Sequence, residues 1–180
     1  GSSSRWHIPM KSPYAMTKHI GEEWIKMYKE VYDLNVQIVR FYNVYGPGEL
    51  VDSHMAAVIG LWRGQVKKNY PITIVGDGKQ RRDFTHIDDI VDGLIRVAES
   101  NKVHDDAWEL GTGKNYSIKE IFTHYNYPNV EYKEDKPGEA ITTLCTDKKA
   151  FLDLEWKASI KITDYIKDYI RKQRVIKSTV

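Results

Sequence analysis

The longest regular pattern of apolar positions lies near the start of the chain. Ser12 before Pro13 is typical of a helix N-cap followed by proline in the first turn. After it, apolar residues recur every three or four positions, which places them on one face of an α-helix. These residues are Ile20, Trp24, Met27, Tyr28 and Val31. The pattern therefore predicts a helix from about Pro13 to Tyr32.

The rest of the chain alternates short apolar stretches with turn residues. Strands are expected at 36–41, 72–75 and 108–110, with edge strands at 130–133 and 142–145. Helices are expected at 54–66, 88–99, 118–125 and 162–171, a loop at 43–48, and a turn at 76–78. Ser117 and Glu120 have the spacing of a capping box. The pattern predicts a mixed α/β protein without the regular strand–helix alternation of a complete parallel sheet.

Composition narrows the possible functions. The 180 residues carry a net charge of +2, from 27 basic and 25 acidic side chains, which favours neither nucleic acid nor a membrane surface as a partner. Cys145 is the only cysteine, so neither an internal disulfide nor a four-thiolate metal site can form. The six histidines lack metal-ligand spacing, and no metal site is expected. No apolar run approaches the ~20 residues of a membrane span, and no signal peptide is recognisable, so a cytoplasmic protein is expected.

The strongest candidate for chemistry is the pair Tyr14 and Lys18. On a helix, positions i and i+4 lie on one face, so the phenol and the ammonium group lie side by side. A free tyrosine ionises only near a pKa of about 10, and a neighbouring cation favours the phenolate. Such a pair can transfer a proton near neutral pH. The alternative is a surface pair, because Tyr-x-x-x-Lys occurs by chance in many helices.

Four segments in a fixed order decide between these alternatives. They are Ser12-Pro13-Tyr14-Ala15-Met16-Thr17-Lys18 with Glu22, Arg40-Phe41-Tyr42-Asn43-Val44-Tyr45-Gly46-Pro47, Gly76-Asp77-Gly78-Lys79-Gln80-Arg81-Arg82-Asp83-Phe84 leading into Thr85-His86-Ile87-Asp88-Asp89, and Lys136-Pro137-Gly138-Glu139 before Thr146-Asp147-Lys148-Lys149-Ala150. Together they resemble the extended short-chain dehydrogenases/reductases of the NAD-dependent epimerase/dehydratase family, similar to UDP-glucose 4-epimerases, over the C-terminal half of such a protein.

The resemblance implies roles for individual residues. Tyr14 would be the general acid/base on a sugar hydroxyl, and Lys18 would assist it and bind the ribose of the nicotinamide. Ser4, in the serine run 2–4, would be the third catalytic residue. Tyr42 lies in the segment that implies contact with the NAD cofactor, and Asn43 in the same segment would contact the nucleotide-sugar.

The substrate residues have alternatives. Asn43 could instead be a loop asparagine bonded to its own backbone. Arg82 would grip the substrate's diphosphate in bidentate fashion, unless it pairs with Asp83 or Asp88. Lys136 stands where the family commonly has arginine. A lysine keeps the positive charge but lacks the planar guanidinium that can bind two oxygens at once.

The glycine-rich turn of a dinucleotide site is missing from the 180 residues. NAD binding needs a Gly-x-Gly-x-x-Gly type turn between a strand and a helix, and the sequence contains none. The segment 111–114 is not a phosphate loop, because Asn115 follows where serine or threonine is required. We expect it to be a strand-to-helix turn.

The expected fold is therefore a truncated, Rossmann-like α/β fold that lacks the N-terminal dinucleotide-binding strands and retains the small C-terminal substrate-binding domain. Residues 1–50 would be the remnant of the Rossmann domain with the active-site helix. Residues 51–180 would mainly form the sugar-nucleotide domain, with about 88–110 returning to the Rossmann core.

Three hypotheses follow for the function. The chain could belong to an NAD-dependent epimerase or dehydratase of a UDP- or dTDP-sugar, complemented by an N-terminal half. It could be a redox-inactive protein that binds nucleotide-sugars. It could also be a homo-oligomeric assembly module in which the Tyr14 helix packs against a copy of itself. Trp6-His7 supplies no acidic pair near the catalytic serine, which favours an epimerase over a 4,6-dehydratase.

Overall fold

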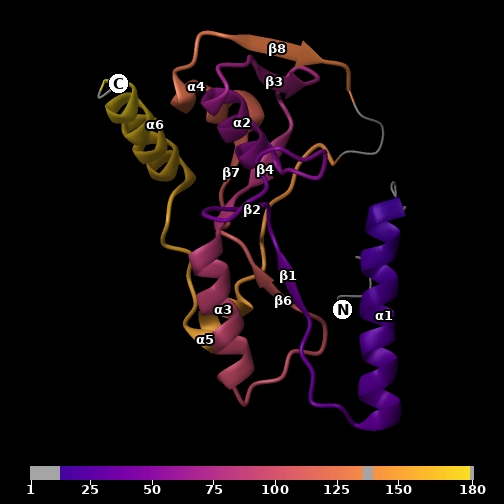
Figure 1. Cartoon of the computed structure of the whole chain (residues 1–180). Helices are drawn as coiled ribbons and strands as arrows, with labels where there is room; N and C mark the ends of the chain where they lie inside the picture. The colour runs from indigo at the N-terminus through magenta and orange to yellow at the C-terminus, as the bar shows by residue number, and fades with distance from the viewer. Residues whose placement is uncertain (1–12, 136–139, 179–180) are drawn as a thin grey trace.

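The computed structural model of the protein describes residues 13–135 and 140–178 (Figure 1). Its helices are α1 (Pro13–Tyr32), α2 (Val58–Lys67), α3 (Ile87–Glu99), α4 (Ile118–Tyr125), α5 (Lys149–Leu154) and α6 (Ile162–Ser178). Its strands are β1 (Val39–Phe41), β2 (Val44–Tyr45), β3 (Ile72–Val75), β4 (Arg81–Asp83), β5 (Thr85–His86), β6 (Trp108–Leu110), β7 (Asn115–Ser117) and β8 (Val130–Lys133). The chain thus has the mixed α/β character that its apolar pattern predicts.

The described strands pair two by two. β1 pairs with β6, β2 with β5, and β3 with β8, all in parallel, while β4 and β7 are antiparallel. In Figure 1 the β1–β6 pair lies with α3 and α5 in the lower part of the molecule, and β3 and β8 lie with α2 and α4 in the upper part. β2, β4 and β7 connect the two parts. Segments far apart in sequence therefore meet between the upper and lower parts.

Two clusters of buried side chains hold these parts together. The first, here the Trp62 cluster, consists of Tyr45, Ile59, Trp62, Val66, Ile72, Ile74, Phe84, Ile118, Ile121, Tyr125, Ile162 and Ile166. The second, here the Trp108 cluster, consists of Ile90, Val97, Trp108, Leu110, Ala150, Leu154 and Trp156. In the second cluster α3 approaches β6 closely, because a Cβ at Gly93 would lie 2.6 Å from Cδ1 of Leu110. Only glycine allows this approach.

The packing changes from one cluster to the other within β2. Val44 packs against the Trp108 cluster, and the next residue, Tyr45, belongs to the Trp62 cluster. The hydroxyl of Tyr45 donates to the carbonyl of Ile160, 2.9 Å away, which fixes the segment before α6. The predicted domain division at residues 50 and 51 stays a prediction.

Most predicted elements are confirmed, with shifted ends. The predicted helix 13–32 has these bounds in α1, and the capping box forms, with Ser117 Oγ and the Glu120 carboxylate each accepting a backbone N–H. The predicted helix at 54–66 begins only at Val58, because Ala57 is extended and acts as the N-cap. α6 continues to Ser178, beyond the predicted end at 171.

The predicted strand at 142–145 is wrong. Thr142 makes one isolated bridge to Arg81, and the segment then leaves the strand because its next partners are side chains. The backbone N–H of Cys145 donates to the Asp83 carboxylate, and the N–H of Asp83 donates to the hydroxyl of Thr143. Two further corrections concern loops. The expected loop at 43–48 contains β2, and the segment 111–114 leads into β7 before any helix begins.

Candidate active site

Tyr14 and Lys18 lie together near the beginning of α1. The Lys18 Nζ atom is 5.3 Å from the centroid of the Tyr14 ring, so the cation faces the aromatic ring. Both side chains are exposed, Tyr14 to 69%. Because α1 and β1 run in opposite directions, the Tyr14 end of α1 lies on the same side of the molecule as the carboxyl end of β1 (Figure 1). Asn43 follows that end of β1.

Arg40 of β1 connects α1 to the rest of the chain. Its Nε and Nη2 atoms donate to the two carboxylate oxygens of Glu22 over 2.7 and 2.6 Å, a bidentate pair. Nη1 and Nη2 also donate to Asp106 over 3.1 and 3.0 Å, and Nη1 lies 3.8 Å from the Glu109 carboxylate. The hydrogen bonds that Arg40 donates to Glu22 and Asp106 raise the pKa of Arg40. Glu22 is four residues after Lys18, so this cluster positions the helix that carries the pair.

Asn43 and Arg82 line the same cavity. It has a volume of about 260 Å³ and lies between the end of β1, the start of α2, β3 and β4. Oδ1 of Asn43 accepts a hydrogen bond of 3.1 Å from the Thr143 hydroxyl, a side chain distant in sequence. Nη1 of Arg82 donates to the carbonyls of Arg81 and Ile141. The structure thus brings together these two predicted substrate residues.

Tyr42 is directed toward β6. Its hydroxyl donates to Oε2 of Glu109 over 2.8 Å, and the side chain is half-buried. Burial, with the Glu109 carboxylate beside it, raises the pKa of Tyr42 above its ordinary value, so the phenol remains a hydrogen-bond donor. The hydroxyl of Tyr42 therefore has a structural partner within the chain, and its predicted contact with the NAD cofactor stays a prediction.

Asp83 is a polar anchor directly after Arg82. The residue is 0% exposed, and its carboxylate accepts hydrogen bonds from the backbone N–H groups of Thr112, Gly113 and Cys145 and from the Thr112 hydroxyl. A buried carboxylate with several donors is well satisfied. Asp83 therefore joins β4, the turn after β6 and the segment before α5, and it fixes the part of β4 that carries Arg82.

The remaining predicted site residues, Ser4 and Lys136, lie outside the described residues. Lys18 is the described residue that the family pattern assigns to the nicotinamide ribose, and the 180 residues contain no glycine-rich turn for the cofactor's phosphates. The contact of Lys18 with NAD stays a prediction. Among residues 13–135 and 140–178, no three His, Cys, Asp or Glu side chains gather into a metal-binding group. None of the described helices combines the length and apolar character needed to cross a membrane.

Sequence reasoning missed the partners that fix this site. It recognised Glu22 and Arg40 as parts of motifs, but it did not predict that they bind each other or that Asp106 joins them. It also missed Asp83 as an anchor. One signal was available: a charged residue, Arg40, interrupts an otherwise apolar stretch, and a buried strand tolerates such a residue when acidic partners are near.

Residues 2–111 match the model of the NAD dependent epimerase/dehydratase family, which is more than half of the chain. The chain belongs to this family. A putative UDP-glucose 4-epimerase of Methanocaldococcus jannaschii is 33% identical over 161 residues, which cover 87% of this chain and 51% of that protein. The region matched by the family model, residues 2–111, contains Tyr14, Lys18, Asn43 and Arg82.

Solved structures of the family have the same fold. UDP-glucose 4-epimerase of Thermotoga maritima, determined with UDP-glucose, superposes with a TM-score of 0.80 at 25% identity, over 90% of this chain and 54% of that one. UDP-glucuronic acid 4-epimerase of Bacillus cereus, determined with UDP-glucuronic acid and NAD, gives 0.79 at 29% identity, over 92% of this chain and 54% of that one. The described elements therefore form part of a Rossmann-like epimerase/dehydratase fold. The chain spans about half the length of these relatives.

Proposed function

We propose that this chain provides the proton-transfer pair and part of the substrate site of an NAD-dependent nucleotide-sugar epimerase or dehydratase, with a UDP- or dTDP-sugar as substrate. The observation that carries the proposal is the placement of the predicted residues. Tyr14 and Lys18 lie together near the beginning of α1, and this end of the helix lies on the same side of the molecule as the carboxyl end of β1. Asn43 and Arg82 line the cavity that follows the end of β1. Family membership and the two complexes with UDP-sugars support it.

In this mechanism the chain's own residues bind the substrate and move a proton. Tyr14 takes the proton of a sugar hydroxyl and later returns it, and the ammonium group of Lys18 stabilises the phenolate. Ser4 shares the hydrogen bond to that hydroxyl. Bound NAD would supply hydride transfer, and only Lys18 and Tyr42 of this chain are assigned to its nicotinamide end.

The substrate's charged part is assigned to the cavity around Asn43. The Asn43 amide offers both a donor and an acceptor to a phosphate or a base. The guanidinium of Arg82 can grip two oxygens of a diphosphate, and Lys136 adds a second positive charge. Because the relatives named above are 4-epimerases, we favour epimerisation over dehydration. In this proposal residues 1–50 and about 88–110 belong to the Rossmann part, and the rest of 51–180 binds the nucleotide-sugar.

A second candidate is a redox-inactive module that binds nucleotide-sugars or assembles into oligomers. The exposed apolar side chains of α1 favour it, since such a surface is typical of contact with another protein chain. They include Ile20, Trp24, Met27, Tyr28 and Val31. The contacting chain would be a complementing N-terminal half or a second copy of this chain.

Titration calorimetry of the purified chain with UDP-glucose and, separately, with NADH discriminates between these candidates. Saturable binding of both ligands supports the enzymatic proposal. Binding of UDP-glucose alone means that this chain is a nucleotide-sugar module that needs a complementing half for redox chemistry. If neither ligand binds and the native mass is that of an oligomer, the chain is an assembly module and the enzymatic proposal fails for it.

Two substitutions test the assigned residues in the same titration. Tyr14→Phe should leave the affinity for UDP-glucose within about twofold, because the hydroxyl acts on the reaction and contributes little to binding. Arg82→Gln should weaken binding about tenfold or more, as expected for a charged hydrogen bond worth roughly 1.5–3 kcal/mol. Arg171→Gln is the matched control, because Arg171 bonds to Asp168 on α6 and does not line the cavity. Equal affinities for Arg82→Gln and the control would contradict the diphosphate role.

A further inference from the structure

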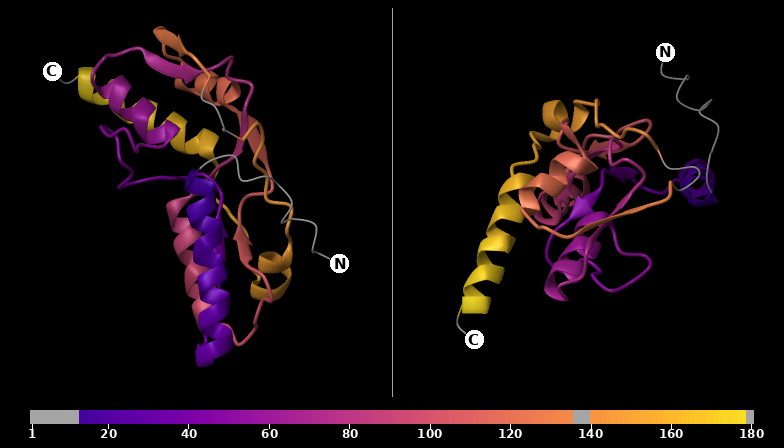
Figure 2. Two further views of the ribbon diagram at one scale, coloured as in Figure 1. Left: turned by 90° about the vertical axis from the view of Figure 1, so that its right-hand side faces the viewer. Right: turned by 90° about the horizontal axis from the view of Figure 1, so that it is seen from above.

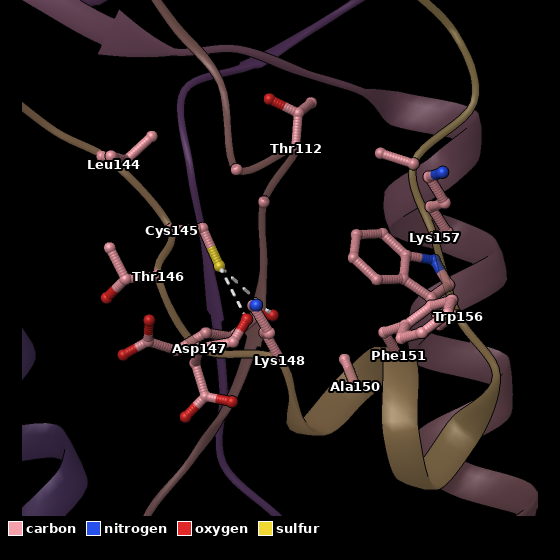
Figure 3. Close-up of a pocket in the computed structure, with 14 residues that line it drawn as sticks. Thr112, Leu144, Cys145, Thr146, Asp147, Lys148, Ala150, Phe151, Trp156 and Lys157 are labelled. Carbon is pink, nitrogen blue, oxygen red and sulfur yellow. Dashed lines mark hydrogen bonds between the residues drawn. The ribbon is translucent and has the colours of Figure 1, made fainter.

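A second, larger cavity lies away from the predicted substrate residues. Its volume is about 540 Å³, within the range of small-molecule sites. The residues that define this cavity, here the Trp156 pocket, are Thr112, Cys145, Lys148, Phe151, Trp156 and Lys157. Figure 3 shows Trp156 across the space from Leu144 and Thr146, with the Cys145 thiol directed into the space between them. The pocket therefore combines an aromatic wall with a polar one.

The Trp156 pocket is separate from the cavity that contains Asn43 and Arg82. The two cavities have no lining residue in common. The residues next to Asn43 and Arg82 in the chain contact the walls of the Trp156 pocket: Tyr42 bonds to Glu109, and Asp83 bonds to Thr112 and Cys145. Arg82 and Asp83 are successive residues of β4 and therefore point to opposite sides of this strand, so the two cavities lie on opposite sides of β4.

Hydrogen bonds hold the walls of this pocket in place. Trp156 is 3% exposed, and its Nε1–H donates to the carbonyl of Asp89 over 2.9 Å. The Asp83 carboxylate holds Thr112 and Cys145 on the opposite wall. A ligand that enters would not need to order these groups first, and this reduces the entropic cost of binding.

Two cations at the rim have no partner within the described chain. Lys148 and Lys157 are exposed, and neither ammonium group has an acidic or hydrogen-bonding partner among residues 13–135 and 140–178.

The acidic groups of the pocket are already engaged. Glu109 accepts from Tyr42 and lies 3.8 Å from Arg40, and Asp147 accepts the backbone N–H of Lys149. The backbone N–H does not neutralise Asp147, which keeps its negative charge, whereas Arg40 lies beside Glu109 and balances it. Lys148 and Lys157 outnumber this one unbalanced carboxylate of the lining, and they favour an anionic group placed beside them.

The thiol of Cys145 is part of the wall and is not a nucleophile. Burial raises the pKa of Cys145 to about 12, with the neighbouring Glu109 and Asp83 carboxylates acting in the same direction. The Sγ atom lies 3.8 and 3.7 Å from the carbonyl oxygens of Glu109 and Asp147, as a thiol donor does. The pocket is thus suited to reversible binding.

We propose that the Trp156 pocket is a second ligand site and that it binds a small organic acid with a flat apolar body. The body lies against Phe151, the exposed aromatic side chain of the lining, and the carboxylate or sulfonate lies near the ammonium groups of Lys148 and Lys157. This class of ligand matches the pocket in both respects, since aromatic side chains bind flat apolar groups and unpaired ammonium groups attract an anion. The site is independent of the proposed nucleotide-sugar chemistry.

The test uses 2-naphthoate as the probe and 2-naphthamide as its neutral counterpart. Amide chemical shifts of the isotope-labelled chain are followed by NMR during each titration. We expect saturable shifts at Thr112, Gly113, Lys148 and Lys157, with a dissociation constant of roughly 1 mM, as is usual for a ligand of this size. The neutral amide should bind at least about fivefold more weakly, because it loses the attraction to both lysines.

Matched variants locate the site and separate it from adsorption to other apolar surfaces. The double variant Lys148→Gln/Lys157→Gln and the variant Phe151→Ser should each weaken binding of 2-naphthoate at least about fivefold. Lys149→Gln and Leu152→Ser are the controls, because these neighbours are exposed and do not line the pocket. All five positions are exposed, and the dispersion of the amide spectrum confirms that each variant folds. Shifts confined to α1, equal affinity for acid and amide, or equal effects of variants and controls would each overturn the proposal.

Discussion

Helix α1 and the Trp62 cluster contain similar apolar residues but bury them very differently. Trp24 of α1 is 61% exposed, whereas Trp62 of α2 is 0% exposed and donates its Nε1–H to the carbonyl of Thr73. None of the residues of α1 is buried by the described chain. Figure 2 shows α1 apart from the other helices, at the side of the molecule in the view from above. The difference shows that apolar periodicity predicts a helix and its apolar face, while burial depends on a surface that the periodicity does not specify.

The largest expected effect contrasts these two tryptophans. Trp62→Ala should lower the free energy of unfolding by about 3–5 kcal/mol, because it leaves a cavity among packed side chains and removes a hydrogen bond. Trp24→Ala should change it by less than about 0.5 kcal/mol. Urea denaturation followed by far-UV circular dichroism measures both values. If Trp24→Ala were as damaging as Trp62→Ala, α1 would be packed in solution, and a lower native mass of the variant would identify the packing as self-association.

The next effect concerns the polar anchor of the folded core. Asp83→Asn should cost about 2 kcal/mol of stability, because the amide replaces an acceptor oxygen by a donor that faces the N–H groups of Thr112, Gly113 or Cys145. Asp105→Asn is the control, since Asp105 is exposed. The same denaturation experiment checks the difference. Equal stabilities of these two variants would mean that the segments around Asp83 rearrange without lowering the free energy of unfolding.

A smaller, local effect is expected at the ion-pair cluster of α1. Arg40→Gln removes the bidentate contact with Glu22 and leaves Asp106 without its cation. Hydrogen exchange in α1 should become about tenfold faster, which corresponds to a loss of roughly 1.4 kcal/mol, while exchange in α2 should not change. Arg40→Lys should be intermediate, because lysine keeps the charge without the fork. Mass spectrometry of peptides from both helices measures the rates. Faster exchange in both helices would show that Arg40 stabilises the whole fold.

The smallest expected effect is that the contact between Arg40 and Asp106, which helps to hold α1, weakens at low pH. Burial alone would raise the pKa of Asp106, but the hydrogen bonds and positive charge of Arg40 outweigh it and lower the pKa below the ordinary 3.8. A carboxylate with a lowered pKa stabilises the folded state above its unfolded pKa, and the contribution is lost as the pH falls through the folded value. Protection of α1 should therefore be constant from pH 7 to 5 and decline below about pH 4. Hydrogen exchange, corrected for intrinsic rates, tests this, and Asp106→Asn should reduce the decline.

The sequence predicts well those elements whose apolar spacing repeats over enough residues to be recognised. α1 and α3 show apolar spacing over several turns, and the capping box of α4 is a local pattern between Ser117 and Glu120. The strands β2, β4, β5 and β7 have only two or three residues each. Alternation cannot be recognised over two or three residues, and β4, β5 and β7 are mostly polar, so these strands could not be predicted. The equally short β6 could be predicted because Trp108 and Leu110 form a local apolar stretch.

The sequence predicts the motifs of the candidate site but not the contacts between residues that are far apart in the chain. Tyr14 and Lys18 are neighbours through helix geometry, so their proximity follows from spacing alone. The contact between Asn43 and Thr143 joins residues 100 positions apart, and that between Arg40 and Asp106 spans 66. Contacts at such separations depend on the complete packing, which a local pattern does not contain. The same reason explains why the segment at 142–145, apolar enough for a strand, is instead held by the Asp83 side chain.

Because Cys145 is buried, chemical labelling of its thiol can report when the surrounding structure opens locally. It is the only cysteine in the sequence, and it is 6% exposed. Burial raises the pKa of this thiol, so very little of it is ionised at pH 8 in the closed form. A disulfide reagent in solution therefore modifies the chain at the rate at which residues 143–147 separate from β6. Colorimetric thiol labelling can time this motion without any engineered label, and ligands that occupy the neighbouring pocket should slow it.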